Sequence, residues 1–193
     1  MFSWLDFLTY AIITAVTPGP NNIMSLSNAS RYGFRKSFPF NLGILVGFSI
    51  VMIACTLFCS LLSSVIPMIK MPMLIVGSIY MLHLAWKTFS SSPEIEEKNA
   101  RIGFHSGFAL QFVNPKIYIY GIVSMQAYIL PYYQNQPFHL LGFALLLAFI
   151  GFLFTLCWSG FGSMFKLLFS KYAKITNTIM SLLLVYCAIS LFL

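Results

Sequence analysis

Long apolar segments separated by short polar connections dominate this sequence of 193 residues, and they constrain its fold more than any other feature. Only 8% of the residues are charged, whereas a soluble domain carries about 25%. Runs of about 20 apolar residues match the length of a helix that crosses a bilayer. The composition excludes a soluble enzyme, a disordered chain and a nucleic-acid-binding protein. It predicts an all-α polytopic membrane protein with the lipid bilayer as its solvent.

We expect six transmembrane helices, one in each apolar segment. The segments cover residues 5–25, 39–64, 68–88, 104–130, 138–164 and 173–193. The first ten residues lack a basic region and a small-residue cleavage site, so they predict a retained first span rather than a signal peptide. The four cysteines lie within apolar runs and predict no disulfide framework. No cluster of residues has metal-ligand spacing, so no metal or other cofactor is expected.

The basic residues predict the orientation in the membrane. Nine of the eleven Lys and Arg residues lie in the first, third and fifth connections. These are Arg31, Arg35, Lys36, Lys87, Lys98, Arg101, Lys166, Lys171 and Lys174. Because basic connections stay in the cytoplasm, both termini are expected in the periplasm. Aromatic residues would then mark the outer surface (Trp4, Tyr132, Tyr133) and the inner one (Trp86, Trp158, Tyr172).

The polar stretch in the middle of the chain divides one transmembrane domain into two halves. Residues 1–89 and 104–193 would each hold three spans, joined by a cytoplasmic connection over 90–103. Because three is odd, the second half enters the membrane upside down relative to the first. This inverted repeat is typical of many secondary transporters.

The first candidate site lies inside the first span, where Thr17 is followed by Pro18, Gly19, Pro20, Asn21 and Asn22. Two prolines around a glycine should break the helix. The freed carbonyls and the two Asn amides could bind a polar solute. Alternatively, the break is a structural kink whose polar groups are satisfied by neighbouring helices.

The second candidate site lies at the corresponding place in the fourth span, at Asn114, Pro115 and Lys116. Lys116 lies 13 residues after Gly103, about 20 Å along a helix, which places it near the middle of the membrane. A lysine there costs about 2.5–3.5 kcal/mol, and no acidic residue is expected nearby to pair with it. It should meet carbonyls, Gln111, Asn114 or an anionic group of a substrate. A purely structural lysine is the alternative.

Broken helices at matching positions of two halves are typical of a transporter binding site.

Other features favour packing: Gly43 and Gly47 form a G-x-x-x-G pattern, and glycines recur at 142, 151, 160 and 162. These small-residue faces would permit a homodimer. The three histidines (His83, His105 and His139) are expected near the membrane surfaces, although a titrating histidine could also join a proton path.

The TPGPNN stretch at residues 17–22 and the QFVNPK stretch at residues 111–116 resemble the LysE/RhtB (lysine exporter) family of small amino-acid exporters. The resemblance covers six spans, the P-G-P-N break, the basic Gly33-Phe34-Arg35 segment and the N-P-K motif. It implies an inner-membrane secondary transporter that exports small neutral amino acids or derivatives, of the cysteine/O-acetylserine kind. Homoserine or threonine would be alternative substrates. The family motif falls on Pro18, Gly19, Pro20 and Asn21, and on Asn114, Pro115 and Lys116.

The resemblance also implies proton antiport, but many relatives carry Asp where this chain has Asn21. Coupling would then use Lys116, a histidine or the zwitterionic substrate, or transport is not proton-coupled. We expect alternating access about a site between the two breaks, with Lys116 on the substrate carboxylate. A membrane-embedded enzyme is disfavoured because catalytic clusters are missing. A non-transporting assembly subunit and a passive channel remain as alternatives.

Overall fold

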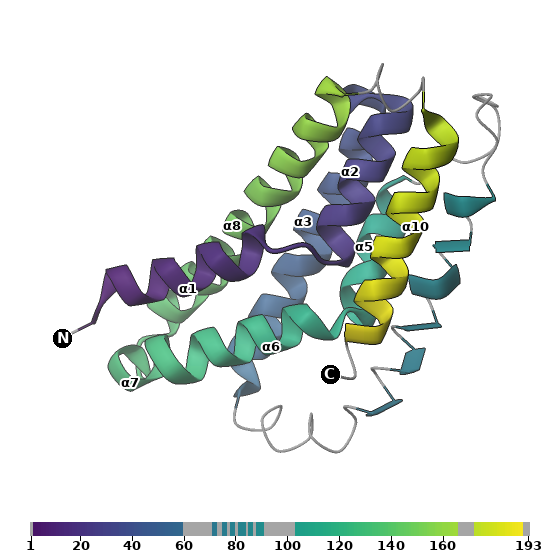
Figure 1. The fold of residues 1–193 in the computed structure, drawn as a ribbon. Coiled ribbons are helices and arrows are strands. Elements are labelled where there is room, and N and C mark those ends of the chain that lie inside the picture. The colour runs from purple at the N-terminus through teal and green to yellow at the C-terminus, as the bar shows by residue number, and fades with distance from the viewer. Residues whose placement is uncertain are drawn as a thin grey trace.

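The structure is a computed structural model that describes residues 2–59, 71–90 with gaps at 73, 74, 77, 80, 84 and 87, 103–165 and 172–190. The regular elements of this part are helical, and the described residues form no strand (Figure 1). In chain order the elements are α1 (Trp4–Val16), α2 (Pro20–Tyr32), α3 (Phe34–Leu57), α5 (Phe104–Val113), α6 (Pro115–Val123), the π-helical η1 (Ser124–Ile129), α7 (Leu130–Tyr133), α8 (Pro137–Met164) and α10 (Ala173–Ser190).

Both expected helix breaks are present. α1 ends at Val16, and α2 begins at Pro20 after an extended Gly19. α5 ends at Val113, and α6 begins at Pro115 after an extended Asn114. In each case proline is the first residue of the second helix, where its missing N–H would have no intrahelical partner. Pro20 and Pro115 therefore occupy equivalent positions, and so do the residues that follow them, Asn21 and Lys116.

The remaining expected segments also contain helix wherever the structure describes them. α3 begins earlier than residue 39, directly after Gly33, whose φ of 82° ends α2 in a conformation that favours glycine. The described residues between 71 and 90 are helical. Within the described ranges, α3 and α8 are long and apolar enough to cross a membrane by length and composition, and α1 and residues 174–189 are shorter apolar helices. The six-span count and the inverted repeat stay predictions.

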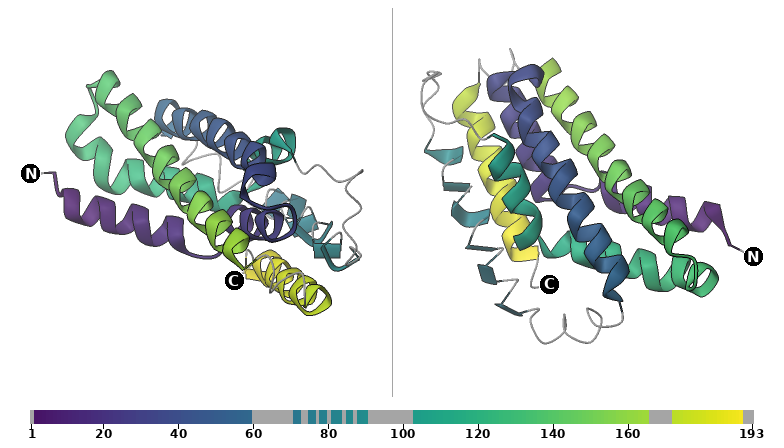
Figure 2. Two further views of the ribbon diagram at one scale, coloured as in Figure 1. Left: turned by 90° about the horizontal axis from the view of Figure 1, so that it is seen from above. Right: turned by 180° about the vertical axis from the view of Figure 1, so that it is seen from behind.

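α2 lies at the centre of the molecule, and its residues 20–30 are all buried. It packs against α8, and α3 packs against α5 (Figure 2). Glycines allow these close approaches, because a Cβ at Gly43 would meet the Phe104 carbonyl and one at Gly107 would meet the Phe40 carbonyl. Gly162 faces the Leu26 carbonyl in the same way. The expectation of close packing fails at Gly142 and Gly160, where a Cβ would meet no described atom within 4 Å.

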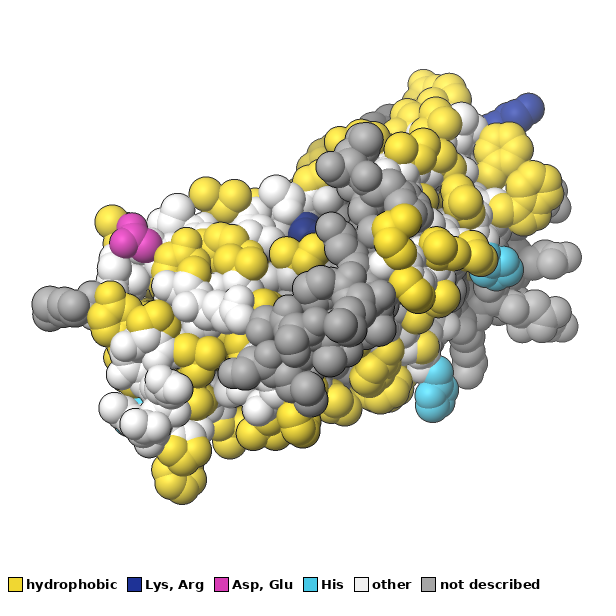
Figure 3. Space-filling view, turned by 90° about the horizontal axis from the view of Figure 1, so that it is seen from below, with side chains coloured by type: hydrophobic (Ala, Val, Ile, Leu, Met, Phe, Trp, Pro, Cys, Tyr) yellow, Lys and Arg dark blue, Asp and Glu magenta, His cyan; other side chains and the backbone are white. Residues whose placement is uncertain are grey.

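Polar side chains lie inside this molecule and apolar ones outside. Asn41, Gln111, Ser124 and Ser159 are fully buried, whereas Leu5 and Trp86 are 77% and 69% exposed. Hydrophobic side chains cover much of the face in Figure 3, and charged ones are few. The interior also contains a hydrophobic core, so the large apolar side chains on the exterior are what suits a surface that faces lipid.

The cations Arg31 and Lys174 lie at the opposite end of the molecule from Asp6, and the orientation in the membrane stays a prediction. Arg31 at the end of α2 donates to Asn177 near the start of α10, which also carries Lys174, so these cations lie at one end. Asp6 lies in the first turn of α1, at the opposite end. Trp4 there shares an aromatic cluster with Tyr132 and Tyr133 through the ring of Phe2. The predicted orientation also depends on basic residues that lie outside the described ranges, namely Lys70, Lys87, Lys98, Arg101, Lys166 and Lys171.

Trp158 is a correction to the expected inner aromatic belt. Its indole nitrogen donates to the Val16 carbonyl at 3.2 Å, at the end of α1. The residue therefore satisfies backbone at the first helix break instead of marking the membrane surface.

Candidate functional site between the two helix breaks

The carbonyls freed at the end of α1 are satisfied by side chains. A helix leaves its last four carbonyls without intrahelical partners. Here the Thr14 carbonyl accepts from the Thr17 hydroxyl at 2.8 Å, and the Ala15 carbonyl accepts from the Asn22 amide at 2.8 Å. Trp158 covers the Val16 carbonyl, and the Thr17 carbonyl accepts from both Asn22 and Lys116. The first break is thus held open by side chains of α2, α6 and α8.

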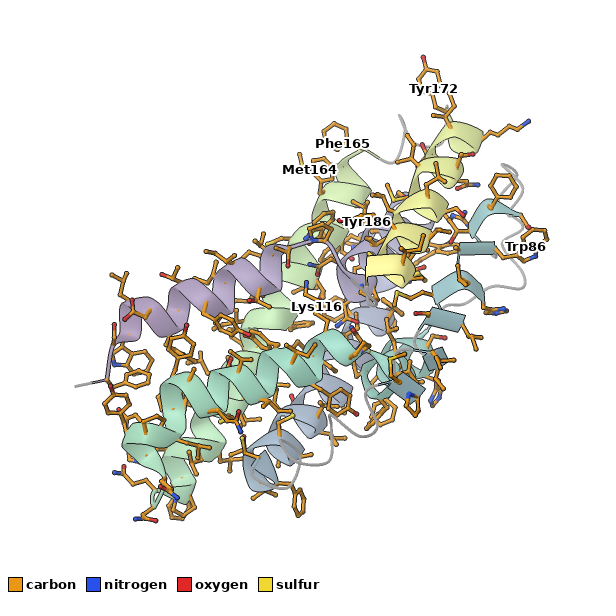
Figure 4. The ribbon with its side chains drawn as sticks, turned by 60° about the horizontal axis from the view of Figure 1, so that its bottom comes forward. Trp86, Lys116, Met164, Phe165, Tyr172 and Tyr186 are labelled. Carbon is orange, nitrogen blue, oxygen red and sulfur yellow. The ribbon has the colours of Figure 1, made fainter. Side chains whose placement is uncertain are left out.

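Lys116 joins the second break to the first. Its Nζ donates to the Thr17 carbonyl at 3.1 Å and to the Thr17 hydroxyl at 2.8 Å, across 99 residues of sequence. The side chain lies in the interior, where α6 approaches the break between α1 and α2, whereas Tyr172 and Trp86 lie at the periphery (Figure 4). The ammonium faces the C-terminal end of α1, the negative end of the helix dipole, which favours a cation. An ammonium has three donors, and the hydrogen bonds to Thr17 use two of them.

No carboxylate of the described ranges lies beside Lys116. Asp6 is the one acidic residue there, and it is 11 residues before Thr17, about 16 Å along α1. The positive charge is therefore compensated by a carbonyl, a hydroxyl and a helix terminus. A carboxylate brought by a solute would form the strongest bond available to it.

Three amides connect the two breaks directly beside this lysine. Asn21 donates to Gln111 Oε1 at 2.8 Å, and Gln111 donates back to Asn21 Oδ1 at 3.1 Å. Asn114 also donates to Asn21 Oδ1, at 3.4 Å, while its own Oδ1 accepts from the Lys116 backbone N–H at 3.1 Å. Gln111 uses its second N–H on the Gly107 carbonyl at 2.8 Å. This network fixes α2 against α5 and the start of α6.

A small cavity of about 40 Å³ lies between the breaks. Such a volume holds only a few water molecules. Its wall contains polar groups of both breaks and an apolar part from α3, α6 and α8. The lining residues are Thr14, Ala15, Gly19, Pro20, Asn21, Asn22, Phe48, Asn114, Lys116, Ile117, Tyr120, Gly151 and Thr155.

Most of the residues expected to bind substrate line this cavity, and three do not. Gly19, Pro20, Asn21, Asn22, Asn114 and Lys116 line it. Gln111 is fully buried and faces Asn21 instead. Pro18 and Pro115 shape the backbone at the breaks and are absent from the lining. The Asn22 amide is occupied by two carbonyls of the first break, so its role in this structure is to hold that break.

The cavity also contains residues that sequence reasoning did not select. Phe48 and Tyr120 pack ring against ring with centroids 5.8 Å apart, and Gly151 faces the Phe48 ring. Thr155 donates to the Phe152 carbonyl of its own helix at 2.8 Å. The polarity of Thr155 inside an apolar span was the sequence signal that could have identified it as a site residue. Nothing local in the sequence distinguishes Phe48 from the other 19 phenylalanines.

A second polar cluster lies one turn along α2 from Asn21. Ser25 donates to Asn41 Oδ1 at 2.7 Å, and Asn41 donates to the Ser159 hydroxyl at 2.8 Å. Ser159 donates to the Ser25 carbonyl at 3.2 Å, which closes the contact among α2, α3 and α8. Further along α2, Arg31 donates to the Thr88 carbonyl at 2.9 Å and to Asn177 at 2.7 Å. Polar groups thus follow α2 from the cavity to the end that carries the cations.

This chemistry suits binding rather than bond cleavage. Among the described residues no group of His, Cys, Asp and Glu could hold a metal ion. The site offers one ammonium, several amides and carbonyls, and a small apolar wall. An amino-acid zwitterion with a short side chain complements each of these groups. Its carboxylate suits the ammonium, its own ammonium suits the carbonyls, and its side chain suits the apolar wall.

Comparison with known proteins identifies the family of the chain. The model of the family described as LysE type translocator matches residues 12–193. The chain belongs to this family. The cysteine/O-acetylserine efflux protein of Salmonella typhimurium (strain LT2) is 43% identical over 190 residues, which cover 96% of this chain and 95% of that protein. The cysteine/O-acetylserine efflux protein of Escherichia coli (strain K12) is 40% identical over 187 residues, with the same coverage.

Membership in the family confirms the resemblance found in the sequence motifs, and no solved structure matches the chain. The match includes both breaks and the α8 wall of the cavity. The translocator family and the efflux relatives support membrane transport rather than catalysis.

Proposed function

We propose that the chain is a secondary transporter of the bacterial inner membrane that exports small neutral amino acids or their derivatives. Cysteine and O-acetylserine are the first candidates, because the relatives at 40–43% identity carry these substrates in their names. Homoserine and threonine are the alternative substrates that the same test must include. Lys116 is the observation that carries the proposal: a cation inside an apolar molecule, in a cavity between two broken helices.

In the proposed binding step the substrate carboxylate takes the position beside Lys116 Nζ. A charge-assisted hydrogen bond to a carboxylate is stronger than the existing bonds to Thr17. The substrate ammonium would bind the carbonyls at the end of α1, which then exchange their side-chain partners for the solute. Binding would thereby loosen the contacts that hold the first break to α6.

In the proposed transport step the two ends of the molecule open alternately. The Ser25–Asn41–Ser159 cluster and the Arg31 contacts are the proposed closure toward the cationic end, because they join α2 to α3, α8 and α10 there. They would part when the site opens to the cytoplasm. Protons are the proposed coupling ion for antiport, and the multi-pass arrangement with periplasmic termini is part of the same proposal. The homodimer stays a prediction.

The test is counterflow in proteoliposomes with a panel of neutral amino acids at two pH gradients. We expect cysteine or O-acetylserine to exchange, with uphill transport when a proton gradient is applied. Lys116→Ala should lower exchange at least about thirtyfold, because truncating one partner of a buried charge pair costs at least about 2 kcal/mol. Lys116→Arg should not restore it, since a planar guanidinium does not fit the position of an ammonium.

Lys174→Ala is the matched control, because Lys174 is exposed at the start of α10. This variant should exchange at the wild-type rate. Normal exchange by Lys116→Ala at equal protein levels would refute the proposed role of the lysine. Absence of any exchange by the wild-type protein would favour an assembly subunit, and exchange without uphill transport would favour a passive channel.

A further inference from the structure

The apolar part of the cavity wall is built around Phe48. Its side chain is 4% exposed, and its ring meets the ring of Tyr120 edge to face with centroids 5.8 Å apart. Tyr120 lies one helical turn after Lys116 on α6, so the aromatic pair lies close to the proposed carboxylate position. Phe48 and Tyr120 thus form the surface that the side chain of a small bound amino acid would contact.

The position of Tyr120 is fixed from two further sides. Its hydroxyl donates to the Leu147 carbonyl of α8 at 3.4 Å. Its ring also stacks on Tyr10 of α1, with centroids 6.2 Å apart and planes 15° from parallel. The wall behind the Phe48 ring therefore cannot retreat without moving α1, α6 or α8.

Gly151 determines where the Phe48 ring can lie. A Cβ at this position would overlap the ring edge at Cε1 and lie about 3.0 Å from Cδ1. The Phe48 ring occupies the space that the side chain of any residue larger than glycine at position 151 would need. Adding one methyl group at Gly151 must push the ring away from α8, and truncating Phe48 must enlarge the cavity.

We infer that the Phe48–Gly151 contact sets the upper size limit of the transported side chain. The substrates would be α-amino acids with neutral side chains no larger than that of O-acetylserine, and aromatic amino acids would be excluded. This inference rests on the proposed function, because it concerns the side-chain end of the same site. Lys116 binds the part that all amino acids share, and the Phe48–Gly151 contact discriminates among them.

The experiment compares kcat/KM in proteoliposome exchange for serine, cysteine, O-acetylserine and phenylalanine. Phe48→Leu should raise the ratio of phenylalanine to cysteine about tenfold, since methylene-sized differences in an apolar pocket already give discrimination of this order. Gly151→Ala should lower the ratio of O-acetylserine to cysteine about tenfold. Because the two variants must shift the size preference in opposite directions, a general loss of activity cannot imitate the result.

Two controls isolate the contact. Gly142→Ala adds the same methyl group to the same helix where a Cβ would meet no described atom within 4 Å, and it should leave both ratios unchanged. Phe143→Leu truncates a buried ring in the aromatic cluster around Phe2 and should also leave them unchanged. Phe48→Met replaces Phe48→Leu if the latter fails to fold.

Unchanged ratios in folded, active Phe48 and Gly151 variants would overturn this inference alone and leave the export function standing. Absence of amino-acid exchange by the wild-type protein would overturn the proposed function, and the size limit with it. Opposite shifts of the two ratios, with both controls unchanged, would establish the size limit.

Discussion

At the residue scale, Asn21 shows how a motif residue can serve binding and structure together. It lines the cavity, yet both its amide nitrogen and its oxygen are paired with Gln111, and Asn114 shares the oxygen. An aspartate at this position could accept from Gln111 and Asn114 but could not donate to Gln111 Oε1. The amide of this chain therefore completes a neutral network next to a cation.

Replacing Asn21 by leucine tests the structural part of that role. The variant removes the partner of the buried Gln111 oxygen and leaves Asn114 Nδ2 without its acceptor. Each unsatisfied buried group costs about 1–3 kcal/mol, so we expect a marked loss of stability. Thermal unfolding in detergent or lipid measures it as a lower Tm. Thr178→Val, which removes an exposed hydroxyl that bonds only the carbonyl one turn before, should leave the Tm nearly unchanged.

At the element scale, the two breaks were predictable because proline and glycine act on the local backbone. Pro18 keeps Thr17 extended, with φ −60° and ψ 143°, and Pro20 starts the next helix. The partners of the freed carbonyls were not predictable, since Trp158 and Lys116 reach them from 142 and 99 residues away. Phe48 was missed for the same reason: only the packing of α3 on α8 brings its ring to the cavity.

Straightening the first break should abolish transport while leaving the protein in the membrane. In Pro18→Ala the residue before position 18 can adopt helical angles, so α1 can extend toward α2 and withdraw the Thr17 carbonyl from Lys116. We expect at least a tenfold loss of cysteine exchange in proteoliposomes. Pro39→Ala, at a proline within α3 outside the cavity lining, is the control and should retain exchange.

The close contact between α3 and α5 gives a stability prediction of its own. A methyl group at Gly107 would overlap the Phe40 carbonyl, and backbone cannot yield as a side chain can. Gly107→Ala should therefore lower the free energy of unfolding by about 1–3 kcal/mol. Gly160→Ala, where a Cβ would meet no described atom within 4 Å, should be neutral or slightly stabilising. Equal Tm values for the two variants would show that the helices are not packed this closely.

At the scale of the whole molecule, composition predicted an all-helical chain with an apolar exterior, because a bilayer permits few other solutions. The sequence could not reveal that α2, with Asn and Ser at many positions, is buried from Pro20 to Ser30. Asn21, Ser25 and Arg31 find their partners only once α5, α3 and α10 pack against this helix. Asn41 and Ser159 lie inside apolar spans, and their polarity there is a signal that the sequence does contain.

Alternating access predicts that fixing the Asn41–Ser159 contact stops transport. Asn41→Cys with Ser159→Cys, in a background without the four native cysteines, places two thiols where an amide and a hydroxyl lie 2.8 Å apart. Oxidation should block exchange, and a reductant should restore it. Each single cysteine variant is the control and should be insensitive to oxidation. Full exchange by the cross-linked protein would rule out opening at this contact.

The pairing of Lys116 with a substrate carboxylate is tested most directly by transport of cysteine and of its decarboxylated analogue, cysteamine, in proteoliposomes of the wild-type and Lys116→Ala proteins. We predict that the wild-type protein prefers cysteine at least about thirtyfold, and that Lys116→Ala loses this preference because only cysteine transport falls. An equal fall for both compounds, or an unchanged preference in Lys116→Ala, would contradict the central claim.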